Sequence, residues 1–426
     1  MIVIYTPKVT NRIKYTFDFV FSQYFGIDYT IVHEPITAFV SSNIYINYSK
    51  EIKQQYFNIV QHDLLLETNI TPQELFVSRV TNFSVFFKQD NRFDLSFDIF
   101  SSIFYLIARY EEYLPHQQDT HGRYLSSNSI LAHSDFRFAP VVEYWLLYFK
   151  QRLEEQFTTL IFKKHNFEYF PTFDIDNAYK FKGRNWFQHF PNFLSSDFWK
   201  YICHISKDKY DVYDDIFKLL KETNSSSIFF FLLNDEGKLN SKVSPRADAL
   251  QQLINTCKEL ATIGIHPSYH APTQTVLFDN ELDILATYTG RIAVVSRQHF
   301  LRVSFPHYYR ELSNTVIQTD YSLAYPDVPG FRAGCSRPFY FFDIELDTQT
   351  HLKIQASCWM DATYAYYQTL DAEQINLNFL TLFNQLIEIS GILVPIFHND
   401  LLASEKYWGV FKFINKLATS RDELKI

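Results

Sequence analysis

The run Phe167-Glu-Tyr-Phe-Pro-Thr-Phe-Asp-Ile-Asp176 is an apolar stretch of strand length that ends in two carboxylates. Beyond it, strand-like and helix-like segments alternate along the chain. Strands are expected at 167–173, 226–233, before residue 266, and at 292–302, 316–321, 353–360 and 392–397, and helices at 211–223, 246–262, 280–289, 372–390 and 407–417. This alternation is typical of parallel strands joined by crossover helices, and it predicts a doubly wound sheet or a barrel.

The part of the chain before this run has a different pattern. Short strands are expected at 1–5, 29–33 and 43–46, and helices follow at 95–113 and 141–156. Because 426 residues exceed one ordinary hydrophobic core, we predict an N-terminal α/β accessory domain over residues 1–160 and a second domain over 161–426. Asp119, His121 and Arg123 are expected to form a buried ion-pair group, with contact to the second domain or to a substrate as the alternative.

Composition argues against several classes of function. The formal charge is −8, and no long basic run is present, so nucleic acid is not expected as a partner. The four cysteines show no CxxC spacing and are interpreted as reduced thiols. No apolar run approaches the roughly 18 residues of a membrane span, and the N-terminus becomes polar too early for a signal peptide. We therefore expect a cytoplasmic protein without a membrane span.

Polar residues follow the predicted strands directly. In α/β folds the active site gathers at the carboxyl ends of the strands, where loops carry the chemistry and strands fix their bases. The candidates at such positions are Asp174, Asp176, His266, His270, Arg302, Asp361 and His398. We therefore expect these side chains to face one edge of the sheet.

The two carboxylates and the histidine pair are candidate metal ligands. His266 and His270 are four residues apart, a spacing that brings two imidazoles to one side of a helical turn. One carboxylate and two imidazoles leave coordination positions open for water and substrate, which is typical of a catalytic divalent site. Asp174 and Asp176 have alternative interpretations as helix-capping residues, as a glycosyltransferase metal motif, or as one ligand plus one base.

The other candidates have several potential roles. His398 could be a third metal ligand, a general acid or an inert histidine. Arg302 and Arg332 are candidates to orient a carboxylate or to grip a substrate through a bidentate fork. Asp320 and Asp361 could orient one of these arginines or simply end strands.

The order of these pieces resembles the polysaccharide deacetylase, or NodB-homology, domain of the family 4 carbohydrate esterases. Its first motif is similar to Thr172-Phe-Asp-Ile-Asp176, its HxxxH motif to His266-Pro-Ser-Tyr-His270, its Arg-Pro motif to Phe300-Leu-Arg302 with Pro306, and its closing Leu-x-His to Ile396-Phe-His398. The resemblance covers about residues 167–410, and the whole chain is more particularly similar to a two-domain branch from Bacteroidetes. Here Ile175 separates the usual adjacent Asp pair, Arg302 is not directly followed by Pro, and the Asp-Trp motif is not recognisable.

The resemblance implies a fold and a function. The fold would be a distorted (β/α) barrel of about seven strands. A divalent metal, usually zinc with cobalt, nickel or iron as alternatives, would be held by Asp176, His266 and His270. The resemblance further implies Asp174 as base and His398 as acid. We expect Arg302 or Arg332 to keep Asp174 ionised or to bind substrate, with Arg302 preferred for the catalytic role and Arg332, Asp361 and Asp320 as substrate contacts.

The expected activity is hydrolysis of N-acetyl or similar acyl groups on an amino-sugar glycan. Two alternatives remain open. The first is a non-catalytic carbohydrate-binding protein on a degenerate deacetylase domain. The second is a glycosyltransferase that uses Asp174-Ile-Asp176 to bind a metal and a sugar nucleotide.

Overall fold

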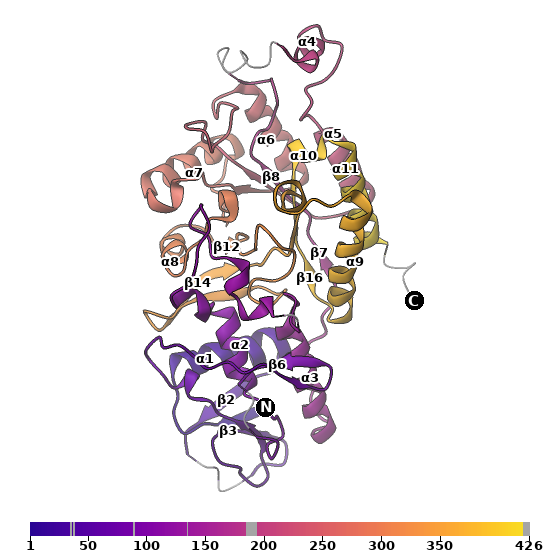
Figure 1. Cartoon of the computed structure of the whole chain (residues 1–426). Helices are drawn as coiled ribbons and strands as arrows, with labels where there is room; N and C mark the ends of the chain where they lie inside the picture. The colour runs from indigo at the N-terminus through magenta and orange to yellow at the C-terminus, as the bar shows by residue number, and fades with distance from the viewer. Residues whose placement is uncertain (35, 37–38, 88–89, 134, 185–193, 421–426) are drawn as a thin grey trace.

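The computed structural model of the protein describes residues 1–34, 36, 39–87, 90–133, 135–184 and 194–420. For description we keep the predicted boundary and use the names N-terminal domain for residues 1–160 and C-terminal domain for residues 161–426. The first holds a four-stranded sheet and the second a nine-stranded sheet, and the two domains are stacked end to end (Figure 1). None of the described helices is long and apolar enough to cross a membrane.

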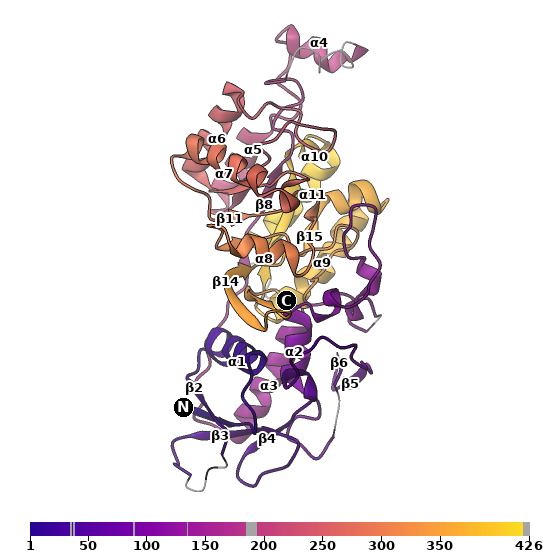
Figure 2. The same ribbon diagram turned by 90° about the vertical axis from the view of Figure 1, so that its left-hand side faces the viewer.

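The N-terminal domain is built on a parallel sheet in the order β2-β1-β3-β4. Its strands are β1 (Ile2–Tyr5), β2 (Tyr29–Val32), β3 (Ile44–Ser49) and β4 (Phe57–Val60), and its helices are α1 (Asn11–Phe17), α2 (Ile99–Ile107) and α3 (Val141–Gln156). Every residue of α2 is buried, and its Phe100 packs against Phe17, Tyr48 and Phe149. Both α1 and α2 lie between the small sheet and the C-terminal domain (Figures 1 and 2).

The sheet of the C-terminal domain has the order β13-β14-β12-β11-β10-β9-β8-β17-β15. Its central strands are β8 (Thr172–Ile175), β9 (Ile228–Phe231), β10 (Thr262–Ile265), β11 (Val295–Ser296), β12 (Thr319–Asp320) and β17 (Pro395–His398). All of these neighbours pair in parallel, and the register aligns Asp174 with both Phe230 and His398. The carboxyl ends of these strands therefore lie side by side, as the alternating pattern predicts.

The nine-stranded sheet is open. Its edge strands are β13 (Phe339–Asp343) and β15 (Trp359–Met360), and no pairing between described residues joins them. The edge strand β13 belongs to a hairpin. It pairs antiparallel with β14 (Thr348–Ile354), and β14 pairs with β12, so the hairpin extends this side of the sheet instead of bringing it to β15. At the other edge β15 pairs with β17. The domain is thus mixed α/β with a long parallel run, and these pairings do not form the closed barrel that the family resemblance implies.

Helices connect the strands of the large sheet. The connecting helices are α4 (Ser196–Ile202), α5 (Tyr213–Glu222), α6 (Asp248–Leu260), α7 (Thr275–Thr289), α8 (His307–Ser313) and α9 (Ala372–Glu388), whereas α10 (Asn399–Leu402) and α11 (Glu405–Thr419) follow the last strand. A separate two-stranded pair is formed by β7 (Glu168–Tyr169) and β16 (Ile392–Leu393). The N-terminus of α9 has a capping box, in which Asp371 accepts from the Gln374 N–H at 2.9 Å and Gln374 accepts from the Asp371 N–H at 3.0 Å.

One expected strand is much shorter than predicted. Only Val295 and Ser296 of the segment 292–302 pair as β11, and the chain then forms the short 3₁₀ helix η8 (His299–Leu301). Phe300 and Leu301 adopt left-handed backbone conformations, with φ of 61° and 51°, which a strand does not tolerate. The strand therefore ends early and frees the following polar residues to face the sheet edge.

Buried charges join the two domains. Arg332, a predicted substrate contact, is fully buried and donates from Nε and Nη2 to Glu112 of the N-terminal domain. Glu112 also accepts from Arg109 Nε at 2.8 Å. Burial alone would raise the pKa of Glu112, but the charges of Arg332 and Arg109 outweigh it and lower that pKa. The guanidinium of Arg332 therefore takes part in the contact between the two domains, where its Nε and Nη2 donors are already bound to Glu112.

Replacing Glu112 by glutamine is expected to destabilise the protein by about 3–5 kcal/mol at neutral pH, because the buried charge of Arg332 loses its counter-charge. The contribution follows the lowered pKa: it is present above the unfolded-state value of glutamate and is lost as pH falls through the folded-state value. Urea unfolding measures the loss. The control is Glu154→Gln, an exposed partner of Lys150. Equal unfolding midpoints for the two variants would contradict the prediction.

Candidate metal centre

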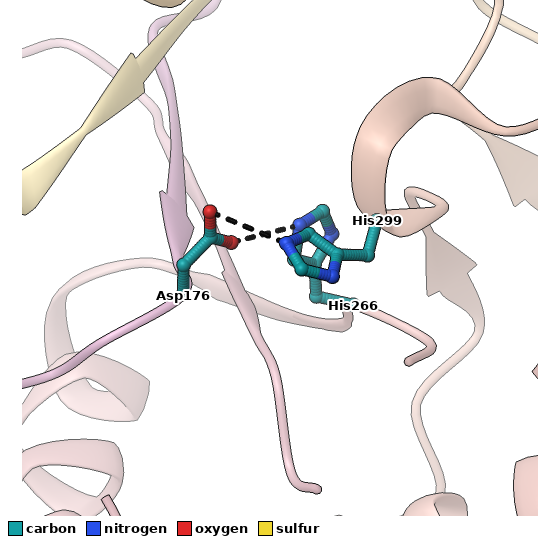
Figure 3. A group of neighbouring side chains, drawn as sticks. All are labelled: Asp176, His266 and His299. Atoms are coloured by element: carbon teal, nitrogen blue, oxygen red, sulfur yellow. Dashed lines mark ion pairs between the residues drawn. The ribbon is translucent and has the colours of Figure 1, made fainter. Parts of the chain in front are cut away.

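Three side chains from neighbouring strand ends converge on one point. Asp176 follows β8, His266 follows β10, and His299 begins η8 after β11. One ligand atom from each lies within 4.8 Å of the others, and Figure 3 shows both imidazoles facing the carboxylate. His266 Nε2 is 3.1 Å from Asp176 Oδ1, and His299 Nε2 is 3.4 Å from Asp176 Oδ2. We call these three residues the ligand cluster.

The hydrogen bonds of the ligand cluster fit a cation. His266 Nδ1 lies 2.5 Å from the carbonyl oxygen of Arg297 and must donate to it, so Nε2, which faces Asp176, is the nitrogen that could bind a cation. Asp176 Oδ1 and His299 Nδ1 are buried and have no hydrogen-bond partner among the residues that the structure describes. Burial would raise the pKa of Asp176, but the two imidazoles outweigh it and lower that pKa well below its usual range. An ionised carboxylate and two imidazole nitrogens are a donor set suited to zinc and similar divalent ions.

His270 does not belong to the ligand cluster. It is exposed and precedes the 3₁₀ helix η7 (Ala271–Thr273). The spacing argument requires a helical turn over residues 266–270, but this segment is irregular, with Ser268 N–H bound to Glu281 and Tyr269 N–H bound to Asn240. The position expected for His270 is taken by His299. The sequence pattern hid His299 because it lay inside a segment interpreted as one long strand.

Asp174 lies beside the ligand cluster and is held by an arginine. Its Oδ1 accepts from Arg297 Nη1 at 2.7 Å, and its Oδ2 is 3.8 Å from His266 Nε2. Arg297 is buried, donates also to Ser357 Oγ at 3.0 Å and to the Tyr321 carbonyl at 3.2 Å, and lies 4.5 Å from the centre of the Phe230 ring. The carboxylate is therefore fixed in orientation and has a permanent counter-charge.

Arg302, expected to support Asp174, lies elsewhere. It donates to the carbonyl oxygens of His121 and Tyr269, each at 2.9 Å, and its guanidinium stacks 4.6 Å from the centre of the Tyr269 ring. The residue that contacts Asp174 is Arg297, which directly follows β11. Because β11 ends at Ser296, the rule that functional side chains follow strand ends selects Arg297, whereas the longer strand predicted over 292–302 and the match to an Arg-Pro motif had both selected Arg302.

His398 and Asp361 form a second polar pair at the strand ends. His398 Nδ1 lies 2.6 Å from Asp361 Oδ1, and the His398 N–H donates to Asp361 Oδ2 at 2.8 Å. Burial works against protonation of His398, but the charge of Asp361 and this hydrogen bond outweigh it and raise the pKa of His398 to about 10. Asp361, a predicted substrate contact, is itself buried and orients His398. The imidazolium Nε2–H remains available as a proton donor.

Asp320 is placed away from these groups. It is fully buried, and its Oδ2 accepts from Ser296 Oγ at 2.8 Å, Ser322 Oγ at 2.8 Å and the Tyr308 hydroxyl at 3.0 Å. Its acceptors are used within the protein, so its observed contacts tie β12 to β11 and α8 rather than reach the candidate pocket.

The ligand cluster opens into one pocket. Its other lining residues are Arg123, Asp174, Phe300, Leu301, Pro326, Met360, Ala362, Tyr366, Tyr367, His398 and Asp400. We use the name aromatic wall for the apolar and aromatic lining residues Phe300, Leu301, Pro326, Met360, Ala362, Tyr366 and Tyr367; the other lining residues carry carboxylates, imidazoles and one guanidinium. Burial, together with the charges of Asp176 and Asp361, outweighs the charge of His398 and raises the pKa of Asp400 to about 6. Sequence reasoning did not single out Asp400, although it lies two residues after His398 at a strand end.

Replacing Asp361 by asparagine is expected to lower the pKa of His398 by about 1–3 units, because the charge that favours the protonated imidazole is lost. In the unaltered protein burial opposes protonation, but Asp361 raises that pKa to about 10. An NMR titration of the imidazole measures the shift. Asp371→Asn, at the exposed capping box of α9, is the control. An imidazole pKa that stays in place would contradict the role of Asp361.

Comparison with known proteins gives limited similarity. Residues 2–158 match the model of a family of unknown function, DUF7033. No curated protein matches the sequence. Among solved structures, a Pseudomonas aeruginosa protein described as a polysaccharide deacetylase is 13% identical, covering 60% of this chain and 86% of its own, with a TM-score of 0.42. One of the same description from Mycobacterium smegmatis is 14% identical, covering 61% and 86%, with a TM-score of 0.41. The function is therefore inferred from the residues of the pocket.

Proposed function

We propose that the protein is a metal-dependent hydrolase that removes N-acetyl, or similar acyl, groups from an amino-sugar glycan or its precursor. One observation carries this proposal: a single pocket brings together the ligand cluster, the arginine-held carboxylate Asp174 and the protonated imidazole of His398. A cation position beside a base and an acid is what amide hydrolysis near neutral pH requires.

The ligand cluster would hold the ion, with zinc favoured and cobalt, nickel or iron as alternatives. When bound, such an ion acidifies a water and polarises the acyl carbonyl. Asp174 accepts the proton of the attacking water. Arg297 serves this step by fixing Asp174 Oδ1 at 2.7 Å, which leaves Oδ2 on the side of His266 to receive the proton.

His398 completes the reaction on the leaving group. As the water oxygen bonds to the acyl carbon and the C–N bond breaks, the departing nitrogen takes a proton from His398 Nε2. Asp361 fixes the ring through Nδ1 and keeps it protonated until that step. The products are a carboxylic acid and a free amino sugar.

The apolar side of the pocket suits a sugar. Leu301, Met360 and Tyr366 line it, and apolar and aromatic side chains pack against the C–H face of a pyranose ring. Among the residues first expected at the substrate, neither Arg302, Arg332, Asp320 nor Asp361 lines the pocket. The proposed substrate contacts therefore come from the aromatic wall and from Asp400, which offers a hydrogen-bond acceptor near the leaving group.

Elemental analysis of the purified protein, paired with an acetate-release screen over N-acetylated glycans and sugar nucleotides, tests the proposal. The expected result is a divalent metal bound in a fixed ratio to protein, and release of acetate together with a free amine. Glycan binding by calorimetry without acetate release would identify a binding protein instead. Tight binding of a sugar nucleotide without hydrolysis would favour a transferase.

A further inference from the structure

We propose that Arg123, carried by the N-terminal domain, is a positioning residue of the active site. It holds the backbone that presents His299 to the metal and the hydroxyl of Tyr367, which contacts the substrate. The proposal rests on the function proposed above and gives the N-terminal domain a direct part in it. A segment of that domain, purple in both views, extends onto the C-terminal domain (Figures 1 and 2).

Arg123 sits in a rigid turn. Gln118 and Tyr124 form a bridge, and Asp119 Oδ1 accepts from the backbone N–H groups of His121 at 2.8 Å and of Arg123 at 3.0 Å. Gly122 has a φ of 73°, a conformation that favours glycine. Asp119 Oδ2 accepts from Arg123 Nε at 2.7 Å. The guanidinium is therefore fixed by its own turn before it meets the C-terminal domain.

The turn that carries Arg123 contacts two loops of the C-terminal domain beside the pocket. His121 Nδ1 lies 3.1 Å from the Tyr269 hydroxyl, and its ring packs 4.9 Å from the centre of the Phe300 ring. In the opposite direction, Arg302 of the C-terminal domain donates to the His121 carbonyl. These reciprocal contacts explain the position of Arg302 and bring Arg123 to the wall of the pocket.

Arg123 grips the residue that follows a metal ligand. Its Nη1 donates to the Phe300 carbonyl at 2.9 Å. Phe300 and Leu301 are both left-handed, a strained conformation for residues other than glycine that persists only where surrounding contacts hold it. Because His299 immediately precedes this pair, the contact from Arg123 fixes the backbone from which the imidazole reaches Asp176.

Arg123 also sets the direction of a tyrosine hydroxyl. Its Nη2 donates to Tyr367 Oη at 2.8 Å. Since a guanidinium only donates, the hydroxyl must direct its own proton elsewhere. Tyr367 ends the π helix η9 (Thr363–Tyr367), is 46% exposed and lines the pocket. Its hydroxyl is thus prepared to donate a hydrogen bond to an oxygen of the substrate. A purely structural ion pair of Arg123 with Asp119 would require neither contact.

The test compares zinc affinity and kinetics of Arg123→Ala, Arg123→Lys and Tyr367→Phe in the full chain. Ser126→Ala is the control, because it removes a neighbouring inter-domain hydrogen bond to Asp327 without touching the pocket. Zinc affinity is measured by competition with a chelator, and kcat and KM by acetate release.

For Arg123→Ala we expect zinc affinity to fall about 10–100-fold, as for residues that orient metal ligands. Added guanidinium should partly restore it. The zinc affinity of Arg123→Lys should lie between those of Arg123→Ala and the unaltered protein, because one ammonium cannot reach both the Phe300 carbonyl and the Tyr367 hydroxyl. If Arg123→Ala does not fold, the zinc affinity of Arg123→Lys tests the proposal. Tyr367→Phe should keep its zinc and raise KM about tenfold.

Two results would overturn the proposal: zinc affinities of both Arg123 variants equal to that of Ser126→Ala, or a KM unchanged in Tyr367→Phe. If the unaltered protein releases no acetate from any substrate, the proposed function fails. The zinc measurement still decides whether Arg123 positions the ligand cluster.

Discussion

Replacing His299 by alanine is expected to abolish tight metal binding, whereas replacing His270 by alanine leaves it intact. His299 Nε2 lies 3.4 Å from Asp176 Oδ2 and is one of three converging ligands, whereas His270 is exposed and outside the cluster. Losing a direct ligand should weaken binding beyond the roughly 10–100-fold typical of residues that only orient ligands. The chosen variants separate the observed cluster from the HxxxH pattern of the sequence.

Elemental analysis after gel filtration, followed by zinc titration against a chelator, measures the effect. Both substitutions remove one imidazole from the same sheet edge, so His270→Ala is a matched control. A His299→Ala protein that retains its metal in full would reject the ligand cluster. Loss of metal in His270→Ala would instead support the ligand set predicted from sequence spacing, in which His270 binds the metal.

The fold of the sheet could be predicted in its local elements but not in its closure. The periodic segment that becomes α3 has the predicted bounds, whereas the strand predicted over 167–173 divides into β7, in the separate two-stranded pair, and β8, which runs on to Ile175. Whether such strands close into a barrel depends on pairings between residues far apart in sequence. The hairpin of β13 and β14, of which β13 was not foreseen, extends one edge of the sheet beyond β12. The periodicity of the sequence does not indicate whether the sheet closes into a barrel or stays open.

The candidate site was predictable to the extent that its residues lie near the carboxyl ends of strands. Asp176 and His266 directly follow strands, Asp174 lies within β8 and His398 ends β17. All four reach the pocket, because parallel neighbours bring their carboxyl ends to one edge. Spacing failed where it assumed a local conformation. His270 would need a helical turn that does not form, and His299 reaches the cluster only because β11 ends early in a left-handed bend.

Partners distant in sequence were the other source of error. Arg332 and Glu112 are 220 residues apart, and the sequence around Arg332 does not indicate that its guanidinium is already paired with a carboxylate. Asp320 has nearer partners, since its donors are a tyrosine and two serines that lie 2 to 24 residues away. In the sequence, a charged residue that forms a buried ion pair cannot be told from one that binds a substrate, because both kinds occur after predicted strands. Only the contacts in the folded protein distinguish them.

Replacing Asp174 by asparagine is expected to lower kcat by about 10²–10⁴-fold while metal content stays unchanged. Asp174 is outside the ligand cluster, so the ion keeps its donors, and asparagine has nearly the same shape. The carboxamide cannot accept the proton of the attacking water. The variant also leaves Arg297 without a counter-charge, so the control is Asp343→Asn, which breaks the buried bond to Arg310 away from the pocket. Comparable turnover in the two variants would show that loss of an ion pair, rather than loss of a base, explains the effect.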